Sequence, residues 1–61
     1  MSETMLRRPQ VQARTGLSRS TLYHWMKHGK FPQPVKLSER LVAWRESDIN
    51  QWLDSRETRV A

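Results

Sequence analysis

The chain has 61 residues, which leaves room for one domain with one small hydrophobic core. It contains no cysteine, and its histidines, His24 and His28, have no further ligand candidates nearby, so we expect no disulfide, metal or cofactor. No apolar run approaches the roughly 20 residues of a membrane span, and the start lacks the apolar stretch of a signal peptide, so we expect a cytoplasmic protein without membrane contact. The net charge of +5 is large for this length and favours a polyanionic partner.

The two ends of the chain are expected to be less ordered than its middle. Residues 1–7 show no strong periodicity and are predicted to be a frayed lead-in, in which only Met5 and Leu6 can pack onto the core. Residues 56–61 are predicted to fray as well. We therefore expect a single domain that comprises all 61 residues and is ordered from about 6 to 56.

A short first helix is predicted over 9–15. Pro9 suits the first helical position because its missing N–H group needs no partner there, and Gly16 supplies the turn that ends the helix. Isolated helices of about two turns are marginal in water, so this one must be stabilised by packing.

A second helix is predicted from Arg19 to His28, with Ser18 as its N-cap and Gly29 as its C-cap residue. Its apolar side consists of Leu22, Trp25 and Met26. The opposite arc consists of Arg19, Ser20, Tyr23, His24 and Lys27. This arc carries donors and cations but no carboxylate, whereas an ordinary solvated helix surface mixes charges of both signs.

A small hairpin is predicted after the second helix. Two prolines within 30–34 exclude a helix there and predict an extended linker. Two short strands, 35–37 and 41–44, are then predicted on either side of the tip Ser38-Glu39-Arg40.

A last helix is predicted to begin near Glu46-Ser47-Asp48, because acidic residues favour a helix N-terminus. Its inward positions are predicted to be Ile49, Trp52 and Leu53. The three tryptophans, Trp25, Trp44 and Trp52, all fall on inward faces, so we expect them in the core rather than stacked on nucleic-acid bases.

The order of helix, glycine turn and second helix is that of a helix-turn-helix, whose second helix enters the major groove of DNA. The positions expected to lock the two helices together are Val11, Thr15, Leu17, Leu22 and Trp25. Gln12 stands where many such motifs have alanine. Residues 1–30 hold six lysines and arginines against Glu3 alone, a net charge of +5, whereas residues 31–61 hold five charges of each sign. The first half is therefore the candidate anion-binding face.

The segment Thr15–Tyr23, TGLSRSTLY, resembles the AlpA family of prophage regulators, which are relatives of phage excisionases and, more distantly, of MerR-type proteins. Further matching segments are LRRP at 6–9, the run 23–34 with GKFPQP, VKL at 35–37, VAW at 42–44 and ES at 46–47. The likeness covers about Leu6 to Leu53. The chain departs from the family at Ser38, where glycine is frequent, and at Arg14, where an apolar residue is usual.

The resemblance implies a mainly α fold with a small β-hairpin, a winged helix-turn-helix, in a sequence-specific protein that binds double-stranded DNA and comes from a phage or prophage. Such proteins regulate transcription of an integrase gene or act in DNA recombination as excisionases, which bend attachment-site DNA so that the integrase excises the element. The resemblance therefore also implies the cognate integrase as a second partner. Neither role needs a catalytic residue, and no nucleophile–base pair, carboxylate pair or metal cluster is spaced for chemistry, so we do not expect an enzyme.

The second helix is predicted to read DNA through Arg19, Ser20, Thr21, Tyr23, His24 and Lys27. Its first turn, Arg19 to Thr21, is the part of such a helix that reaches base edges or flanking phosphates, although Thr21 can instead pack against the first helix. Tyr23 and Lys27 suit phosphate contacts. His24 suits either a base contact or simple exposure to solvent.

The hairpin is predicted to contribute Lys36, Ser38 and Arg40. The resemblance places these residues on a wing that meets the backbone or minor groove, where an arginine can enter a narrow groove. Glu39 at the tip opposes phosphate unless Arg40 or Lys36 neutralises it. Arg7 and Arg8, just before the first helix, are further candidates for phosphate contacts.

An alternative function is a small protein-interaction module that inhibits or recruits a protein partner through the basic face. Steeply salt-dependent binding to random duplex DNA distinguishes the two, because only a DNA-binding protein shows it. The chain has no heptad repeat and no long apolar surface for a stable dimer, so we expect a monomer in solution that binds cooperatively to repeated DNA sites.

Overall fold

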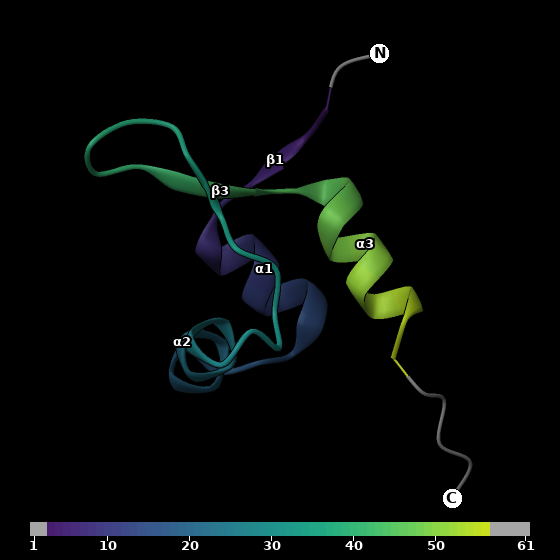
Figure 1. The fold of residues 1–61 in the computed structure, drawn as a ribbon. Helices are drawn as coiled ribbons and strands as arrows, with labels where there is room; N and C mark the ends of the chain where they lie inside the picture. Colours follow the sequence, from purple (N-terminus) through teal and green to yellow (C-terminus); the bar gives the residue numbers. More distant parts are fainter. Residues whose placement is uncertain (1–2, 57–61) are drawn as a thin grey trace, which may run out of the picture.

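The computed structural model describes residues 3–56 and contains three helices and three short strands in that range (Figure 1). In chain order these are β1 (Met5–Leu6), α1 (Arg8–Thr15), α2 (Arg19–Lys27), β2 (Val35–Lys36), β3 (Val42–Arg45) and α3 (Glu46–Asp54). This confirms a mainly α fold with a small β-hairpin, and the helix bounds agree with the predicted ones to within one residue. The predicted fraying of residues 57–61 lies outside the described residues.

Local chemistry accounts for the turn between α1 and α2. Pro9 lies in the first turn of α1, and Gly16 ends that helix with φ 74°, a left-handed conformation that glycine adopts without strain. The Gly16 N–H donates to the Gln12 carbonyl at 2.8 Å. Ser18 is the N-cap of α2, as predicted, because its Oγ accepts the Thr21 backbone N–H at 3.2 Å. Each helix end at this turn therefore has a capping hydrogen bond from a residue of the turn itself.

The sheet has three strands in the order β1-β3-β2, with both pairs antiparallel. Val35 pairs with Ala43 and Lys36 with Val42, which confirms the predicted hairpin, although β2 ends one residue earlier than predicted and β3 begins and ends one residue later. Leu6 is buried, which confirms its predicted packing onto the core, whereas the predicted fraying is wrong at β1, which pairs Leu6 with Trp44. A two-residue strand is too short to show periodicity, and it exists only because β3 supplies its hydrogen-bonding partner.

Nearly every element contributes to one small core. The buried cluster is Leu6, Val11, Leu22, Phe31, Trp44 and Ile49. Trp44 is 1% exposed, and its Nε1 donates to the Pro32 carbonyl at 2.9 Å, so its one polar atom is satisfied. The prediction that all three tryptophans belong to the core is correct for Trp44, whereas Trp25 and Trp52 are half-buried and pack against its edge.

The last helix follows β3 directly and packs back onto the core. Ile49 is buried, and Trp52 and Leu53 are half-buried, which confirms the predicted inward positions. Arg14 of α1 donates to Glu46 at the start of α3 at 2.6 Å, so the residue that departs from the family pattern joins two elements 32 residues apart in sequence. Over residues 3–56, no helix combines the length and apolarity of a membrane span.

Candidate nucleic-acid interface

The two helices α1 and α2 are locked by buried apolar contacts and by hydrogen bonds around their turn. Val11 and Leu22 are both fully buried. Thr15 Oγ1 donates to the Val11 carbonyl at 2.8 Å and accepts the Leu17 N–H at 3.3 Å. Gln12, which replaces the common alanine, donates from its side chain to the Leu17 carbonyl at 3.4 Å. The turn is therefore held by side chains of α1 as well as by its glycine.

One side of α2 is open to solvent. The outer face of α2 is defined here as Arg19, Ser20, Tyr23, His24 and Lys27, and all five residues are exposed. The opposite side holds buried Leu22 with half-buried Trp25 and Met26. The predicted division of this helix into an apolar and a cationic side is thus confirmed, and the outer face contains no carboxylate.

Side chains on the outer face of α2 contact one another. The Arg19 guanidinium lies 5.7 Å from the centre of the Tyr23 ring, within the range of a cation–π contact. The ring of His24 also lies 4.4 Å, between centres, from that of His28, the C-cap residue beyond the outer face. Thr21 differs from its neighbours, because it is half-buried and its hydroxyl accepts a hydrogen bond from Ser18 at 2.9 Å.

The hairpin forms a projecting loop on the same side of the molecule as α2, with α3 on the opposite side (Figure 1). Its tip is a tight turn in which the Leu41 N–H donates to the Ser38 carbonyl at 3.4 Å. The three predicted wing residues, Lys36, Ser38 and Arg40, are all exposed. The hairpin is thus a short projection with two cations, Lys36 and Arg40, on its surface.

A pocket of about 300 Å³ lies between the hairpin, the start of α1 and the outer face of α2. This arginine pocket is lined by Arg7, Arg8, Pro9, Tyr23, Arg40 and Val42. It brings together Tyr23 and Arg40, which were predicted separately as helix and wing residues, with the two arginines at the start of α1. Sequence reasoning named these side chains one by one but missed the cluster, since no local signal joins positions 8 and 40.

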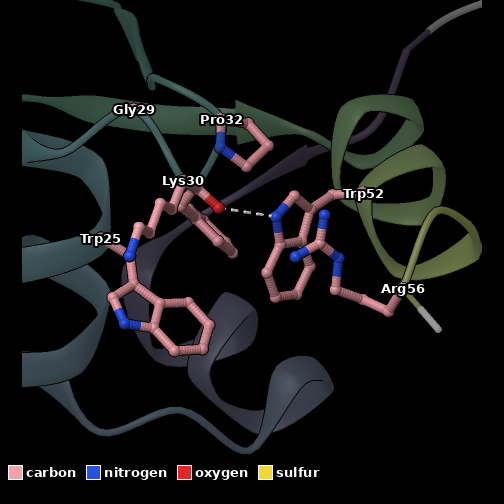
Figure 2. Close-up of a pocket in the computed structure, with 7 residues that line it drawn as sticks. Trp25, Gly29, Lys30, Pro32, Trp52 and Arg56 are labelled. Atoms are coloured by element: carbon pink, nitrogen blue, oxygen red, sulfur yellow. Dashed lines mark hydrogen bonds between the residues drawn. The ribbon is translucent and has the colours of Figure 1, made fainter.

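The far side of α2 is supported by an aromatic cluster (Figure 2). The Trp25 and Trp52 rings lie 6.1 Å apart between centres, and Phe31 meets Trp52 edge-on at 4.8 Å. Trp52 Nε1 donates to the Lys30 carbonyl at 2.9 Å, while the Arg56 guanidinium lies 4.7 Å from the Trp52 ring centre. These contacts hold the C-terminal end of α2 against α3, which keeps the outer face pointing away from the core.

The basic charge of the first half is not all on one face. Arg14 was included in the candidate anion-binding half, but it forms an ion pair with Glu46 at 2.6 Å. It therefore neutralises an acid of α3 rather than adding to the outer face of α2. The exposed cations of the first half on α2 and its C-terminal turn are Arg19, Lys27 and Lys30.

A helix pair with a glycine turn, an exposed cationic second helix and an adjoining β-hairpin together define a winged helix-turn-helix domain. The sequence model of the family described as "Prophage CP4-57 regulatory protein (AlpA)" matches residues 4–57. The chain therefore belongs to the AlpA family.

Two relatives support this assignment. The "DNA-binding transcriptional activator AlpA" of Escherichia coli (strain K12) is 34% identical over 58 residues, which cover 85% of this chain and 83% of that protein. "Uncharacterized protein ORF88" of Enterobacteria phage P4 is 43% identical over 54 residues, which cover 88% of this chain. The chain spans 61% of the length of that phage protein.

Proposed function

We propose that this chain is a sequence-specific DNA-binding protein of phage or prophage origin that regulates transcription. The observation that carries the proposal is the outer face of α2, which is exposed, cationic and free of carboxylates, while the opposite side of the helix is packed on the core. A helix presented in this way fits the major groove of B-form DNA. The relative from Escherichia coli bears the name of a DNA-binding transcriptional activator, which supports the same class of function.

In this proposal α2 and the wing have different tasks. Arg19, Ser20 and His24 contact base edges, with Thr21 at the boundary of the contact because its hydroxyl is already bonded to Ser18. Tyr23 and Lys27 contact phosphates. The wing residues, Lys36, Ser38 and Arg40, meet the backbone or the minor groove next to the site that α2 reads.

The biological role that follows is control of an integrase gene or participation in excision as a directionality factor. The chain acts from the cytoplasm as a monomer that binds cooperatively to repeated sites, and the integrase is its candidate protein partner. No residue is assigned a catalytic task.

The test is a titration of the protein against duplexes from the DNA that flanks its gene, with random duplex as a control, at two salt concentrations. We expect tight binding to one or more flanking sites, weaker binding to random duplex, and affinity that falls steeply with salt in both cases. A footprint then separates the roles, because protection beside an integrase promoter favours regulation and protection inside an attachment region favours excision. Absence of any salt-dependent binding to DNA would overturn the proposal and leave a protein partner of the basic face as the alternative.

A further inference from the structure

The arginine pocket is formed by three separate parts of the chain. Arg7, Arg8 and Pro9 come from the start of α1, Tyr23 from the outer face of α2, and Arg40 and Val42 from the hairpin. Its volume of about 300 Å³ is ample for one phosphate group.

The charges around this pocket are not balanced by neighbouring acids. Three of its six lining residues are arginines, and none is aspartate or glutamate. The ion pairs found among residues 3–56 use Arg14 and Arg45, neither of which lines the pocket. Glu39 adjoins Arg40 in the chain but is exposed and does not line the pocket. Like charges gathered in one cavity repel one another, so the pocket is electrostatically suited to an anion.

A buried donor also lacks a partner here. The Nε atom of Arg8 is buried and makes no hydrogen bond to any group within residues 3–56. Buried polar atoms are nearly always hydrogen-bonded, and an unpartnered one in a native fold calls for an explanation. Because this atom is shielded from solvent, the Arg8 side chain would have to move before an anion in the arginine pocket became its acceptor.

From these observations we infer that the arginine pocket is a binding site, or seat, for a single DNA phosphodiester. The bound phosphodiester links the wing to α2. The inference rests on the proposed function and identifies one contact within it. Guanidinium groups match the geometry of phosphate oxygens through paired N–H donors, and the Tyr23 hydroxyl adds a neutral donor. Pro9 and Val42 give the pocket an apolar part that suits the sugar carbons beside the phosphate.

Occupation of this seat has a mechanical consequence. The same phosphate would contact Tyr23 on α2 and Arg40 on the wing, so binding would restrict the wing to one position relative to the reading helix. Arg8 and Arg40 then contribute to the same phosphate contact. Removal of one arginine therefore also reduces the DNA affinity that the other contributes. Arg8 and Arg40 should therefore be coupled in DNA binding, whereas a wing cation outside the pocket should act independently of Arg8.

The first experiment is a double-mutant cycle on DNA affinity with Arg8→Gln and Arg40→Gln, and a control cycle with Arg8→Gln and Lys36→Gln. Lys36→Gln removes the same charge from the wing but does not touch the pocket. We expect each pocket variant to lose about tenfold or more on specific and random duplex alike. The DNA affinity of the double pocket variant should fall by clearly less than the product of the two single fold-losses. In the control cycle, the fold-loss of the double variant should equal the product of its two single fold-losses. Equal behaviour of the two cycles would overturn the inference.

The second experiment needs no DNA and uses inorganic phosphate as the probe. Melting temperatures are compared in sodium phosphate and sodium chloride at matched ionic strength, for the parent, Arg40→Gln and Lys36→Gln. Arg40 is exposed at the wing tip, so its replacement should leave the fold intact even if Arg8→Gln does not. We expect phosphate to raise the melting temperature of the parent and of Lys36→Gln, but to raise that of Arg40→Gln much less.

The two proposals fail in different ways. If all three proteins respond equally to phosphate, the seat is absent, and this result leaves DNA binding by α2 unaffected. If the parent responds to phosphate through Arg40 but binds no duplex, the anion seat exists while the proposed function is wrong.

Discussion

Two cations on the outer face of α2 occupy different positions, although both are exposed. Arg19 lies in the first turn of the helix, where side chains of a helix in the major groove reach base edges, and its guanidinium is held near the Tyr23 ring. Lys27 lies in the last turn, about two turns further along the helix. An arginine fork can pair with both acceptors of a guanine edge, whereas a lysine acts as a point charge.

For Arg19→Ala we therefore predict a loss of about 1–3 kcal/mol on the specific site and a relaxed preference at one base pair, with the melting temperature close to that of the parent. The measurement is a titration against the site and a set of single-base variants of it. Arg19→Lys is the matched control, because it keeps the charge and removes the paired donors. Parent-like affinity and base preference in Arg19→Ala would mean that α2 is not the reading helix.

Lys27→Ala should weaken binding to every duplex by the same factor and lower the salt slope of the affinity by about one, as expected for one lost phosphate contact. The slope is obtained from titrations of specific and random duplex at several salt concentrations. A changed base preference with an unchanged slope would instead assign Lys27 to base reading.

At the scale of elements, the position of α2 depends on how it begins. Ser18 Oγ accepts the Thr21 N–H at 3.2 Å and also donates to the Thr21 hydroxyl at 2.9 Å, so the cap residue organises the turn that carries Arg19 and Ser20. The neighbouring Gly16 adopts φ 74°, and together they set the direction of the second helix relative to the first.

We predict that Ser18→Ala lowers the free energy of unfolding by about 1 kcal/mol, because the Thr21 N–H loses its acceptor at the helix start. Ser18→Asn retains a capping oxygen and should stay close to the parent. Denaturant unfolding of the three proteins measures the differences. A Ser18→Ala variant as stable as the parent would show that the cap contributes nothing to this turn.

At the scale of the whole molecule, a core of six buried side chains holds together all the elements except β2, which is attached through its pairing with β3. The largest of them is Trp44, whose partner in the sheet is Leu6 of β1. Small domains have little stability beyond the contribution of a few such residues. The two half-buried tryptophans, Trp25 and Trp52, have a narrower task, which is to hold the end of α2 against α3.

Trp44→Ala should cost about 3–5 kcal/mol and leave the domain largely unfolded at room temperature. Trp52→Ala should cost less, because its side chain is only half-buried, and should leave a cooperative melt. Thermal unfolding followed by circular dichroism compares the two variants with the parent. A melt of Trp44→Ala close to that of the parent would contradict the central place of this residue in the core.

The three helices, the N-cap, the linker and the hairpin were predictable from the sequence, because each depends on neighbours in the chain. Proline and glycine constrain their own backbone, Ser18 bonds to a residue three positions away, and the apolar spacing of α2 and α3 marks their inward sides. The outer face of α2 follows from the same periodicity, so its five exposed residues were also predictable.

Only the tertiary structure decided the contacts between segments that are distant in the chain. The strand β1 needs β3 as its partner, Arg14 finds its partner Glu46 32 residues away, and the arginine pocket requires Arg8 and Arg40 to meet. None of these has a local signature, because two-residue strands and single charges carry no periodicity. The sequence by itself therefore determined the three helices, the hairpin and the side of α2 that stays open, while the packing of the small core decided the pairing of β1 and which cations gather beside α2.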